Sequence, residues 1–513
     1  MDIKIKQLGI AATALSSLLL LSSISNADDK KQYERSDSNP TLEAWAEEYP
    51  DHLEMYLEMK DTSKPTEFGG NVPYSKLIRF PQLTELWGGY AFAHDFNEER
   101  GHYYSQIDQY ETGRNNREFL NGVGLKKFKG QPGACMNCHS GWVPELVREM
   151  GWEDFNRTPY WDTVAHLESK HGKGINGSEM GSTCADCHTP DDMSLRVTRP
   201  AYINAMMSRG YEADERYGIK ATQAEMRNHV CEQCHVEYYF KGKDKLLTFP
   251  WDQWPKDRPF KIEMMEAYYD RVAASGEFAK DWTHSTTKAP MLKMQHPEAE
   301  MTSSGRHTRD GVACVDCHMP KKIMNGEEVT DHNLDSPLND LVACKSCHSS
   351  QNESDIRKMV QDVQRHTSGE LNRAEVAILA LIGDIKTVRQ ELALHKDFRS
   401  IQDQTERDAA ISKAIEPALD MHRRASMRWD FVGAENSTGI HSPREAWRIL
   451  DDAEKQAREG QIKLNEAANK YGISFRLTSK GAIPVAPPVL HPGNIVGSEP
   501  PPITMQADNQ CER

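Results

Sequence analysis

Cys135-Met136-Asn137-Cys138-His139 is the first of five segments in this chain that share the spacing Cys-x-x-Cys-His. The others begin at Cys184, Cys231, Cys314 and Cys344. Two thiols at this spacing can bond both vinyl groups of one porphyrin, and the histidine that follows can ligate its iron. Disulfides or zinc-binding cysteine pairs are the alternatives, but neither needs a histidine after every pair. The segments therefore predict five covalently bound haem c groups.

We refer to these segments, in chain order, as motifs 1 to 5. The predicted attachment residues are Cys135, Cys138, Cys184, Cys187, Cys231, Cys234, Cys314, Cys317, Cys344 and Cys347. The predicted proximal iron ligands are His139, His188, His235, His318 and His348. Only 38% of the 513 residues are hydrophobic, so porphyrins would supply much of the apolar core. We expect a mainly α-helical multihaem cytochrome c fold, wrapped around five haems, that folds little without them.

The first 27 residues have the pattern of a secretory signal peptide. Lys4 and Lys6 precede an apolar run over residues 8–24, and Ala27 offers a small residue for cleavage. A retained membrane anchor is the alternative, but the run is shorter than the ~20 apolar residues that span a bilayer. We expect an exported, periplasmic protein, because haem c is attached outside the cytoplasm. The net charge of −15 argues against nucleic acid as a partner.

The haem-binding catalytic region is predicted to span residues 28–352, and a helical region residues 353–480. A row of apolar residues in the helical region has three- and four-residue spacing: Ile378, Leu381, Ile382, Ile385, Val388 and Leu392. Long helices of this kind pack against each other or against a second copy. We favour a homodimer interface; an intramolecular helical hairpin is the alternative. A further helix is expected from Pro443, with Ser442 as its N-cap. Residues 481–513 form a Pro-rich tail that contains Cys511.

Several segments outside the haem-attachment cysteines carry a more specific signal. They are Leu86-Trp87-Gly88-Gly89-Tyr90-Ala91-Phe92, Glu99-Arg100-Gly101-His102, Cys234-His235-Val236-Glu237-Tyr238-Tyr239-Phe240, Lys293-Met294-Gln295-His296-Pro297-Glu298, Gly305-Arg306-His307, Cys317-His318-Met319-Pro320, Thr330-Asp331-His332 and Gly439-Ile440-His441-Ser442-Pro443. In this order they resemble the ammonia-forming cytochrome c nitrite reductases, the pentahaem cytochrome c-552 family. The resemblance covers residues 40–455.

Motif 1 departs from the commoner pattern of that family. The first haem is usually attached through Cys-x-x-Cys-Lys, and the lysine is the proximal ligand of the catalytic iron. Here the position is His139, as in some other members. Because the axial ligand is a main influence on haem potential, we expect the substitution to change the potential and turnover of the active haem.

The resemblance implies that His102, His307, His332 and His441 are distal iron ligands. Four distal ligands suit four relay haems, on the proximal ligands of motifs 2 to 5. The haem on His139 is then open on its distal side and can bind substrate. The sequence does not pair each distal histidine with a motif.

The resemblance also implies a catalytic triad of Arg100, Tyr238 and His296. Arg100 would hold the anion and stabilise charge on its oxygens. His296 would donate a hydrogen bond and protons, and Tyr238 would supply a polar O–H group. The alternatives are a salt bridge between Arg100 and Glu98 or Glu99, packing for Tyr238, and an ordinary loop position for His296.

A calcium site is implied next to the triad. Its ligands would be the Glu237 carboxylate, the Tyr238 and Lys293 carbonyls and the Gln295 side-chain oxygen, an all-oxygen set that suits Ca²⁺. The alternative is that the Lys293 ammonium or a nearby cation supplies the positive charge.

The sequence thus predicts a periplasmic nitrite reductase that forms ammonium by six-electron reduction. The expected partners are nitrite, a second copy of the chain, and an electron donor that is a multihaem cytochrome or a membrane quinol dehydrogenase. Two alternatives remain: an electron-transfer cytochrome with no open haem, or a relative that converts hydroxylamine or sulfite.

Overall fold

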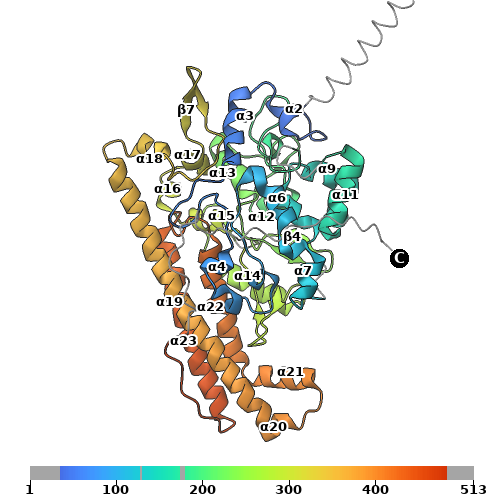
Figure 1. Cartoon of the computed structure of the whole chain (residues 1–513), viewed down its shortest axis with the longest axis vertical. Helices are drawn as coiled ribbons and strands as arrows, with labels where there is room; N and C mark the ends of the chain where they lie inside the picture. The colour runs from blue at the N-terminus through green and yellow to red at the C-terminus, as the bar shows by residue number, and fades with distance from the viewer. Residues whose placement is uncertain (1–34, 127–129, 174–178, 253, 482–513) are drawn as a thin grey trace, which may run out of the picture.

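The computed structural model describes residues 35–126, 130–173, 179–252 and 254–481. The predicted signal peptide and all but the first residue of the predicted tail lie outside these ranges. Within them the protein consists of a rounded body and a projecting bundle of long helices (Figure 1). We call residues 35–352 the body and residues 353–469 the arm.

The body is built from short helices and two-stranded hairpins. Its α-helices are α2 (Leu42–Ala46), α3 (Pro50–Leu57), α4 (Lys76–Arg79), α5 (Leu83–Leu86), α6 (Ser105–Glu111), α7 (Arg117–Gly122), α8 (Met136–His139), α9 (Val143–Met150), α10 (Trp152–Arg157), α11 (Tyr160–His171), α12 (Pro200–Ser208), α13 (Gln223–Glu232), α14 (Ile262–Ala274), α15 (Glu298–Ser303), α16 (Arg306–Arg309), α17 (Cys314–His318) and α18 (Val342–Cys347). Its 3-10 helices are η1 (Glu58–Lys60), η2 (Ala91–Ala93), η3 (His102–Tyr104), η4 (Gly113–Asn115), η5 (Gly133–Cys135) and η6 (Cys184–Asp186). Its antiparallel strand pairs are β1 (Ala213–Asp214) with β2 (Gly218–Ile219), β3 (Tyr239–Lys241) with β4 (Leu246–Thr248), β5 (Trp282–Thr283) with β6 (Pro290–Met291), and β7 (Lys321–Met324) with β8 (Glu327–Thr330).

Each Cys-x-x-Cys-His motif begins in or forms a helical turn. Motif 1 spans the end of η5 and α8, motif 2 begins with η6, and motif 3 begins at the end of α13. Motif 4 is α17, and motif 5 ends α18. Residues three apart lie on the same face of a helix, so each turn presents both thiols of its motif to the same side.

A small apolar cluster supports motif 1 from behind. Met136 of the motif is fully buried with Trp142 and Leu146 of the following segment and with Phe155 and Leu167 from α10 and α11. This packing anchors the backbone of motif 1 on the side of α9, α10 and α11.

The arm consists of α19 (Glu353–Leu394), α20 (Lys396–Arg399), α21 (Gln404–Ala414), α22 (Glu416–Ala434) and α23 (Pro443–Asn469). The row of apolar residues predicted from periodicity is 0–2% exposed, in a bundle of α19, α22 and α23. Gly460 of α23 allows the closest approach, because a Cβ there would lie 2.7 Å from a Leu381 methyl carbon. This row therefore packs within the chain, in a bundle of three helices rather than a hairpin of two, and the homodimer interface stays a prediction.

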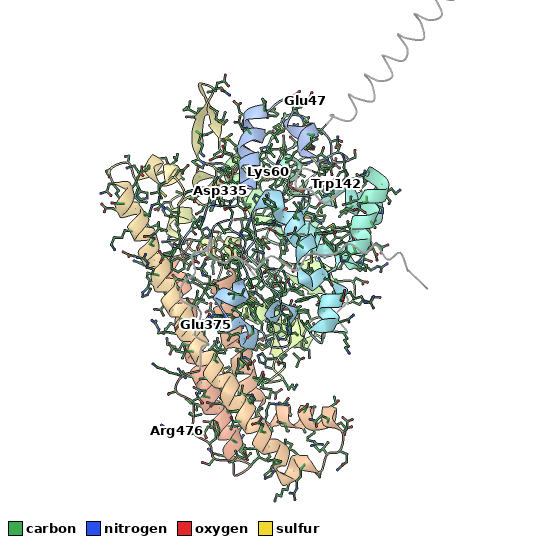
Figure 2. All side chains as sticks on the ribbon, in the orientation of Figure 1. Glu47, Lys60, Trp142, Asp335, Glu375 and Arg476 are labelled. Atoms are coloured by element: carbon green, nitrogen blue, oxygen red, sulfur yellow. The ribbon has the colours of Figure 1, made fainter. Side chains whose placement is uncertain are left out.

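The helix expected from Pro443 is present as α23. Ser442 occupies its N-cap position, but the serine side chain makes no capping hydrogen bond. The arm meets the body near Glu375 of α19 (Figure 2), whose carboxylate accepts hydrogen bonds from Gln82 and Trp429. Within the described residues, no helix has the length and apolar content needed to cross a bilayer.

Candidate functional site

All five motifs line one connected cavity, which lies between the body and residues of the arm such as Gln364, Trp429 and His441. Its volume is 2740 Å³, several times the ~300–1,000 Å³ of a pocket for one drug-sized ligand. Both cysteines and the histidine of every motif are among its lining residues. The ten motif cysteines are free thiols rather than disulfides. The cavity therefore has the size and the attachment groups for several porphyrins.

Four of the five motif histidines face a second histidine across this cavity. The pairs and their ring-centroid separations are His102–His235 at 6.0 Å, His188–His332 at 6.3 Å, His318–His441 at 6.3 Å and His307–His348 at 6.4 Å. Two imidazoles with nitrogens about 2 Å from a shared metal have ring centroids roughly 6 Å apart. The structure thus brings the four histidines predicted as distal ligands to motifs 3, 2, 4 and 5 at a spacing that suits one iron each.

Two of the motif histidines are oriented by backbone carbonyls. Nδ1 of His139 donates to the Ser105 carbonyl at 2.9 Å, and Nδ1 of His188 donates to the Met193 carbonyl at 2.6 Å. On the opposite side of motif 2, His332 donates from Nδ1 to a carbonyl at 2.8 Å. A proton on Nδ1 leaves the Nε2 lone pair free for a metal, which is the usual arrangement of a ligating histidine.

His139 differs from the other motif histidines. Within the described part of the chain, no histidine ring faces it at the separation found for the other four motifs. Tyr238 and His296 lie at motif 1 instead: Tyr238 is close enough to interact electrostatically with Cys135 and Cys138, and His296 with His139. The structure therefore brings two of the three predicted catalytic residues to motif 1.

Glu298 links His296 to motif 3. Its carboxylate lies 3.9 Å from Nδ1 of His296 and 4.0 Å from Nδ1 of His235. The two rings have centroids 6.2 Å apart, but both direct Nδ1 toward Glu298, so the carboxylate rather than a shared metal explains their approach. Burial opposes protonation of His296, but the hydrogen bond and charge of Glu298 outweigh burial and raise the pKa of His296.

Arg100 does not have the free guanidinium that its predicted role requires. Asp108 accepts from its Nε at 2.6 Å and Glu111 accepts from its Nη2 at 2.8 Å, while the guanidinium also lies 4.4 Å from the Tyr104 ring centroid. The alternative of a salt bridge is thus the one observed, although with carboxylates of α6 rather than with Glu98 or Glu99. A doubly paired arginine is a poor anion ligand, so the assignment of Arg100 needs correction.

Arg114 occupies the place expected of Arg100. Its guanidinium lies 3.7 Å from the Phe92 ring centroid, and its Nε donates to Thr112 Oγ1 at 3.1 Å. It lines the cavity and interacts electrostatically with Cys135 and His139 of motif 1. No carboxylate among the described residues forms an ion pair with it. One sequence signal could have redirected the assignment: two acidic residues, Asp108 and Glu111, follow Arg100 at a three-residue spacing that places them on one face of a helix, here α6.

The residues predicted to bind calcium form a buried acidic region. Glu237 is 0% exposed; its Oε2 accepts the Gln295 backbone N–H at 2.6 Å, and its Oε1 has no hydrogen-bond partner. Burial raises the pKa of Glu237 well above its ordinary value. A buried carboxylate oxygen without a donor is satisfied by an oxygen-ligated cation, so the donor set fits calcium.

The Lys293 ammonium pairs with Asp430 rather than with Glu237, and its charge only partly offsets the burial that raises the pKa of Glu237. The ammonium donates to Asp430 Oδ1 at 2.9 Å and lies 4.6 Å from the Trp87 ring centroid, while the Lys293 backbone N–H donates to Asp281. Asp281 is itself buried, which raises its pKa to about 6. The geometry therefore favours a bound cation over the alternative in which Lys293 supplies the charge.

Comparison with known proteins decides the family. The model of the cytochrome c552 family matches residues 41–489. The chain belongs to the cytochrome c552 family. Cytochrome c-552 of Bacteroides fragilis is 35% identical over 84% of this chain and 78% of its own length, and that of Porphyromonas gingivalis is 33% identical over 83% and 76%. The catalytic subunit of cytochrome c nitrite reductase from Desulfovibrio desulfuricans, which has two calcium sites, matches with a TM-score of 0.71 at 27% identity, over 85% of this chain and 88% of that chain.

These matches confirm the family and the mainly helical multihaem cytochrome fold predicted from the sequence. Membership of a cytochrome c family also implies covalently bound haem c. The number of haems, the ligand assignments and the reaction are treated below as proposals.

In this member of the cytochrome c552 family, the cysteines of neighbouring motifs lie close together. The sulfur of Cys138 is near that of Cys234, the sulfur of Cys231 is near that of Cys314, and α17 packs against α18. The contacts connect motif 1 to motif 3, motif 3 to motif 4, and motif 4 to motif 5.

One more cluster has metal-ligand residue types. Glu145 and Glu149 of α9 lie near His171 of α11. Both carboxylates already have protein partners: Arg148 donates to Glu145, and His166 contacts Glu149 at 2.7 Å. The cluster is therefore a satisfied polar contact between two helices.

Proposed function

We propose that this protein is a periplasmic pentahaem nitrite reductase that forms ammonium at motif 1 and relays electrons through motifs 2 to 5. One observation carries the proposal. Four motif histidines face a second histidine at 6.0–6.4 Å, whereas at His139 the facing groups are Tyr238, His296 and Arg114. A pure electron carrier would need a fifth facing histidine.

The reaction consumes nitrite, six electrons and eight protons and yields ammonium and two waters. When bound, haem supplies an iron that can hold the nitrogen of nitrite and deliver electrons to it. The protein residues must hold the anion, stabilise charge on its oxygens and supply protons.

Arg114 is suited to hold the nitrite oxygens. Phe92 and Thr112 fix the plane of its guanidinium, and a planar fork of donors matches a planar anion. His296, oriented by Glu298, donates protons to oxygens that leave as water. The Tyr238 hydroxyl, whose pKa is raised by burial, stays protonated and donates a hydrogen bond to the same oxygens.

The remaining predictions complete the proposal. Calcium at Glu237 would hold the segments of Tyr238 and His296 together, because Gln295 contacts Glu237 directly. Electrons would come from a multihaem cytochrome or a membrane quinol dehydrogenase, and the protein would act as a homodimer. Chelation should lower turnover, and added Ca²⁺ should restore it; turnover that survives chelation contradicts the calcium site.

The test is nitrite reduction by the haem-loaded protein with a reduced dye. Ammonium should accumulate as nitrite disappears, and His296→Ala should lower turnover by ~100-fold while all haems stay attached. His366→Ala, at a half-exposed histidine of the arm, is the matched control and should keep full activity. Nitrite loss without ammonium, or no nitrite loss, would refute the proposal.

A further inference from the structure

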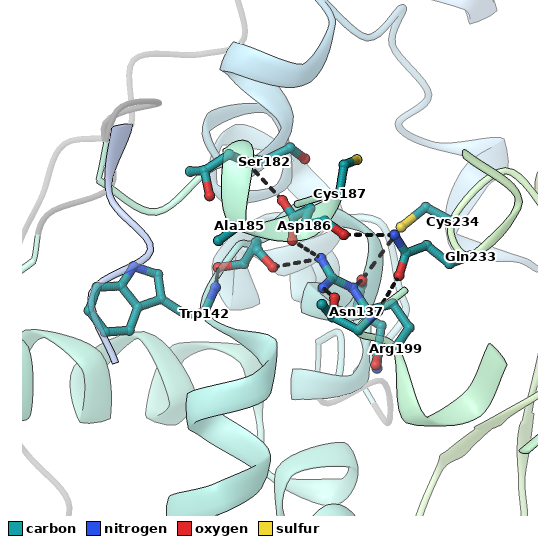
Figure 3. Close-up of polar contacts among 12 residues, drawn as sticks. Asn137, Trp142, Ser182, Ala185, Asp186, Cys187, Arg199, Gln233 and Cys234 are labelled. Atoms are coloured by element: carbon teal, nitrogen blue, oxygen red, sulfur yellow. Dashed lines mark hydrogen bonds and ion pairs between the residues drawn. The ribbon is translucent and has the colours of Figure 1, made fainter. Parts of the chain in front are cut away.

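A single buried arginine joins motifs 1, 2 and 3 (Figure 3). Arg199 precedes α12 and is 1% exposed. Its Nε donates to the Asn137 carbonyl of motif 1, and its Nη2 donates to the Ser140 carbonyl just after that motif at 2.9 Å. Nη2 also donates to the Asp186 carboxylate of motif 2 at 2.5 Å.

Motif 3 is tied to the same point through Gln233. The Gln233 side chain donates to the Asp186 carbonyl at 2.9 Å and accepts the backbone N–H of Thr198, the neighbour of Arg199, also at 2.9 Å. Asn137, Asp186 and Gln233 each occupy the position before the second cysteine of their motif. The residues that the haem-attachment pattern leaves free are therefore used to hold three motifs in one arrangement.

The two charges of the Arg199–Asp186 pair contact different motifs. The Arg199 guanidinium donates to backbone carbonyls within and just after motif 1, whereas the Asp186 carboxylate belongs to motif 2 and accepts the Thr183 N–H that precedes that motif. The positive end of the pair therefore lies against motif 1, and the negative end lies within motif 2.

We propose that the buried Arg199–Asp186 pair lowers the reduction potential of the motif 2 haem relative to that of the motif 1 haem, and so directs electrons from motif 2 toward His139. Reduction adds one negative charge to an iron, so a fixed positive charge favours it and a fixed negative charge opposes it. Both side chains are 2–9% exposed, where charges interact more strongly than in water. Each transfer moves one electron between two irons, with no bond made or broken. The inference rests on the relay of the proposed function.

Motif 4 provides a matched control. Asp316 occupies the same position in its motif as Asp186 and pairs with Arg227, but these side chains are 36–37% exposed. Both aspartates also accept a backbone N–H at the start of their motif, from Thr183 and Ala313. The local hydrogen bonding is thus alike, while the burial of the ion pair differs.

The test is a redox titration of the haem-loaded protein, followed by optical and electron paramagnetic resonance spectra. Asp186→Asn should raise the reduction potentials of the haems, and most of all that of the low-spin haem with the lowest potential. Arg199→Gln should lower them, most of all that of the high-spin haem assigned to motif 1. Asp316→Asn should produce a smaller shift than Asp186→Asn.

The opposite shifts in reduction potential expected for Asp186→Asn and Arg199→Gln distinguish an electrostatic role from a structural one. Loss of packing alone would change haem loading or stability without shifting the potentials in opposite directions. If Arg199→Gln fails to load haem, two other variants still test the inference. Asp186→Asn should raise the reduction potentials, and Arg199→Lys, which keeps the positive charge, should change them little. Shifts of the same sign for both charge removals, or a shift in Asp186→Asn no larger than in Asp316→Asn, would overturn the inference. The absence of a high-spin haem would refute the proposed function but not this inference. The direction of each shift in reduction potential can still be measured on the low-spin haems.

Discussion

The body and the arm differ in how their interiors are built. In the arm, α19, α22 and α23 bury a continuous row of aliphatic side chains against each other. In the body, short helices and loops surround a cavity of 2740 Å³ that all five motifs line. The apolar cluster extends from the arm into the body, but only the body combines it with a large cavity lined by cysteines and histidines. The proposed chemistry lies at that cavity, to which the arm contributes His441.

The largest expected effect is the loss of haem. In a full-length chain made without haem attachment, amide hydrogen exchange should be fast throughout the body and stay slow in α19, α22 and α23. Hydrogen exchange with mass spectrometry, against the haem-loaded protein, measures this. Equal loss of protection in both regions would mean that the arm has no stability of its own.

The next effect is confined to the body. Arg114→Gln should lower kcat/KM for nitrite by ~100- to 1,000-fold, because it removes the charge that we place on the nitrite oxygens. Arg100→Gln should have a much smaller effect, since Asp108 and Glu111 already neutralise that arginine. Steady-state kinetics of both variants distinguishes them. A larger loss in Arg100→Gln would restore the assignment made from the sequence.

The arginines show where sequence reasoning succeeded and where it stopped. The motifs, the family and the apolar row of the arm follow from local spacing, and local spacing is visible in one chain. Arg100 and Arg114 differ through their neighbours in space: one meets two carboxylates of α6, the other an aromatic ring. Such differences arise from tertiary packing, which residue type does not reveal.

The pairing of the histidines was hidden for a related reason. His102 lies opposite His235, and His441 opposite His318, across more than a hundred residues of sequence in each case. The resemblance selected four side chains, and only the fold shows which motif histidine each one faces. The convergence on Arg199 was also invisible, because it uses positions that the Cys-x-x-Cys-His pattern leaves unspecified.

A substitution in the arm should lower stability and leave nitrite turnover unchanged, whereas one at Arg114 should lower turnover. Leu381→Ala removes a fully buried side chain and should cost the arm about 2–5 kcal/mol of unfolding free energy. Leu394→Ala, in the same helix at 72% exposure, should change it by less than about 0.5 kcal/mol. Denaturation followed by far-ultraviolet circular dichroism measures both. Nitrite turnover of both folded variants should equal that of the wild type; a loss in Leu381→Ala would show that the arm shapes the catalytic site.

The smallest effect belongs to the junction of the two regions, at Glu375. Burial raises the pKa of this carboxyl to about 7, although Gln82 and Trp429 both donate hydrogen bonds to it. Because the folded state holds the proton more tightly than the unfolded state, this group destabilises the fold progressively as pH rises from about 4.5 to 7, by at most about 3 kcal/mol. Glu375→Gln should remove that slope and be more stable than the wild type at pH 8, whereas Glu391→Gln, at an exposed position of the same helix, should keep the wild-type slope. Urea titrations across this pH range measure the difference. If Glu375→Gln retained the wild-type slope, the junction would not sense pH, and the arm and body would be joined there by hydrogen bonds that are indifferent to the charge of the carboxyl.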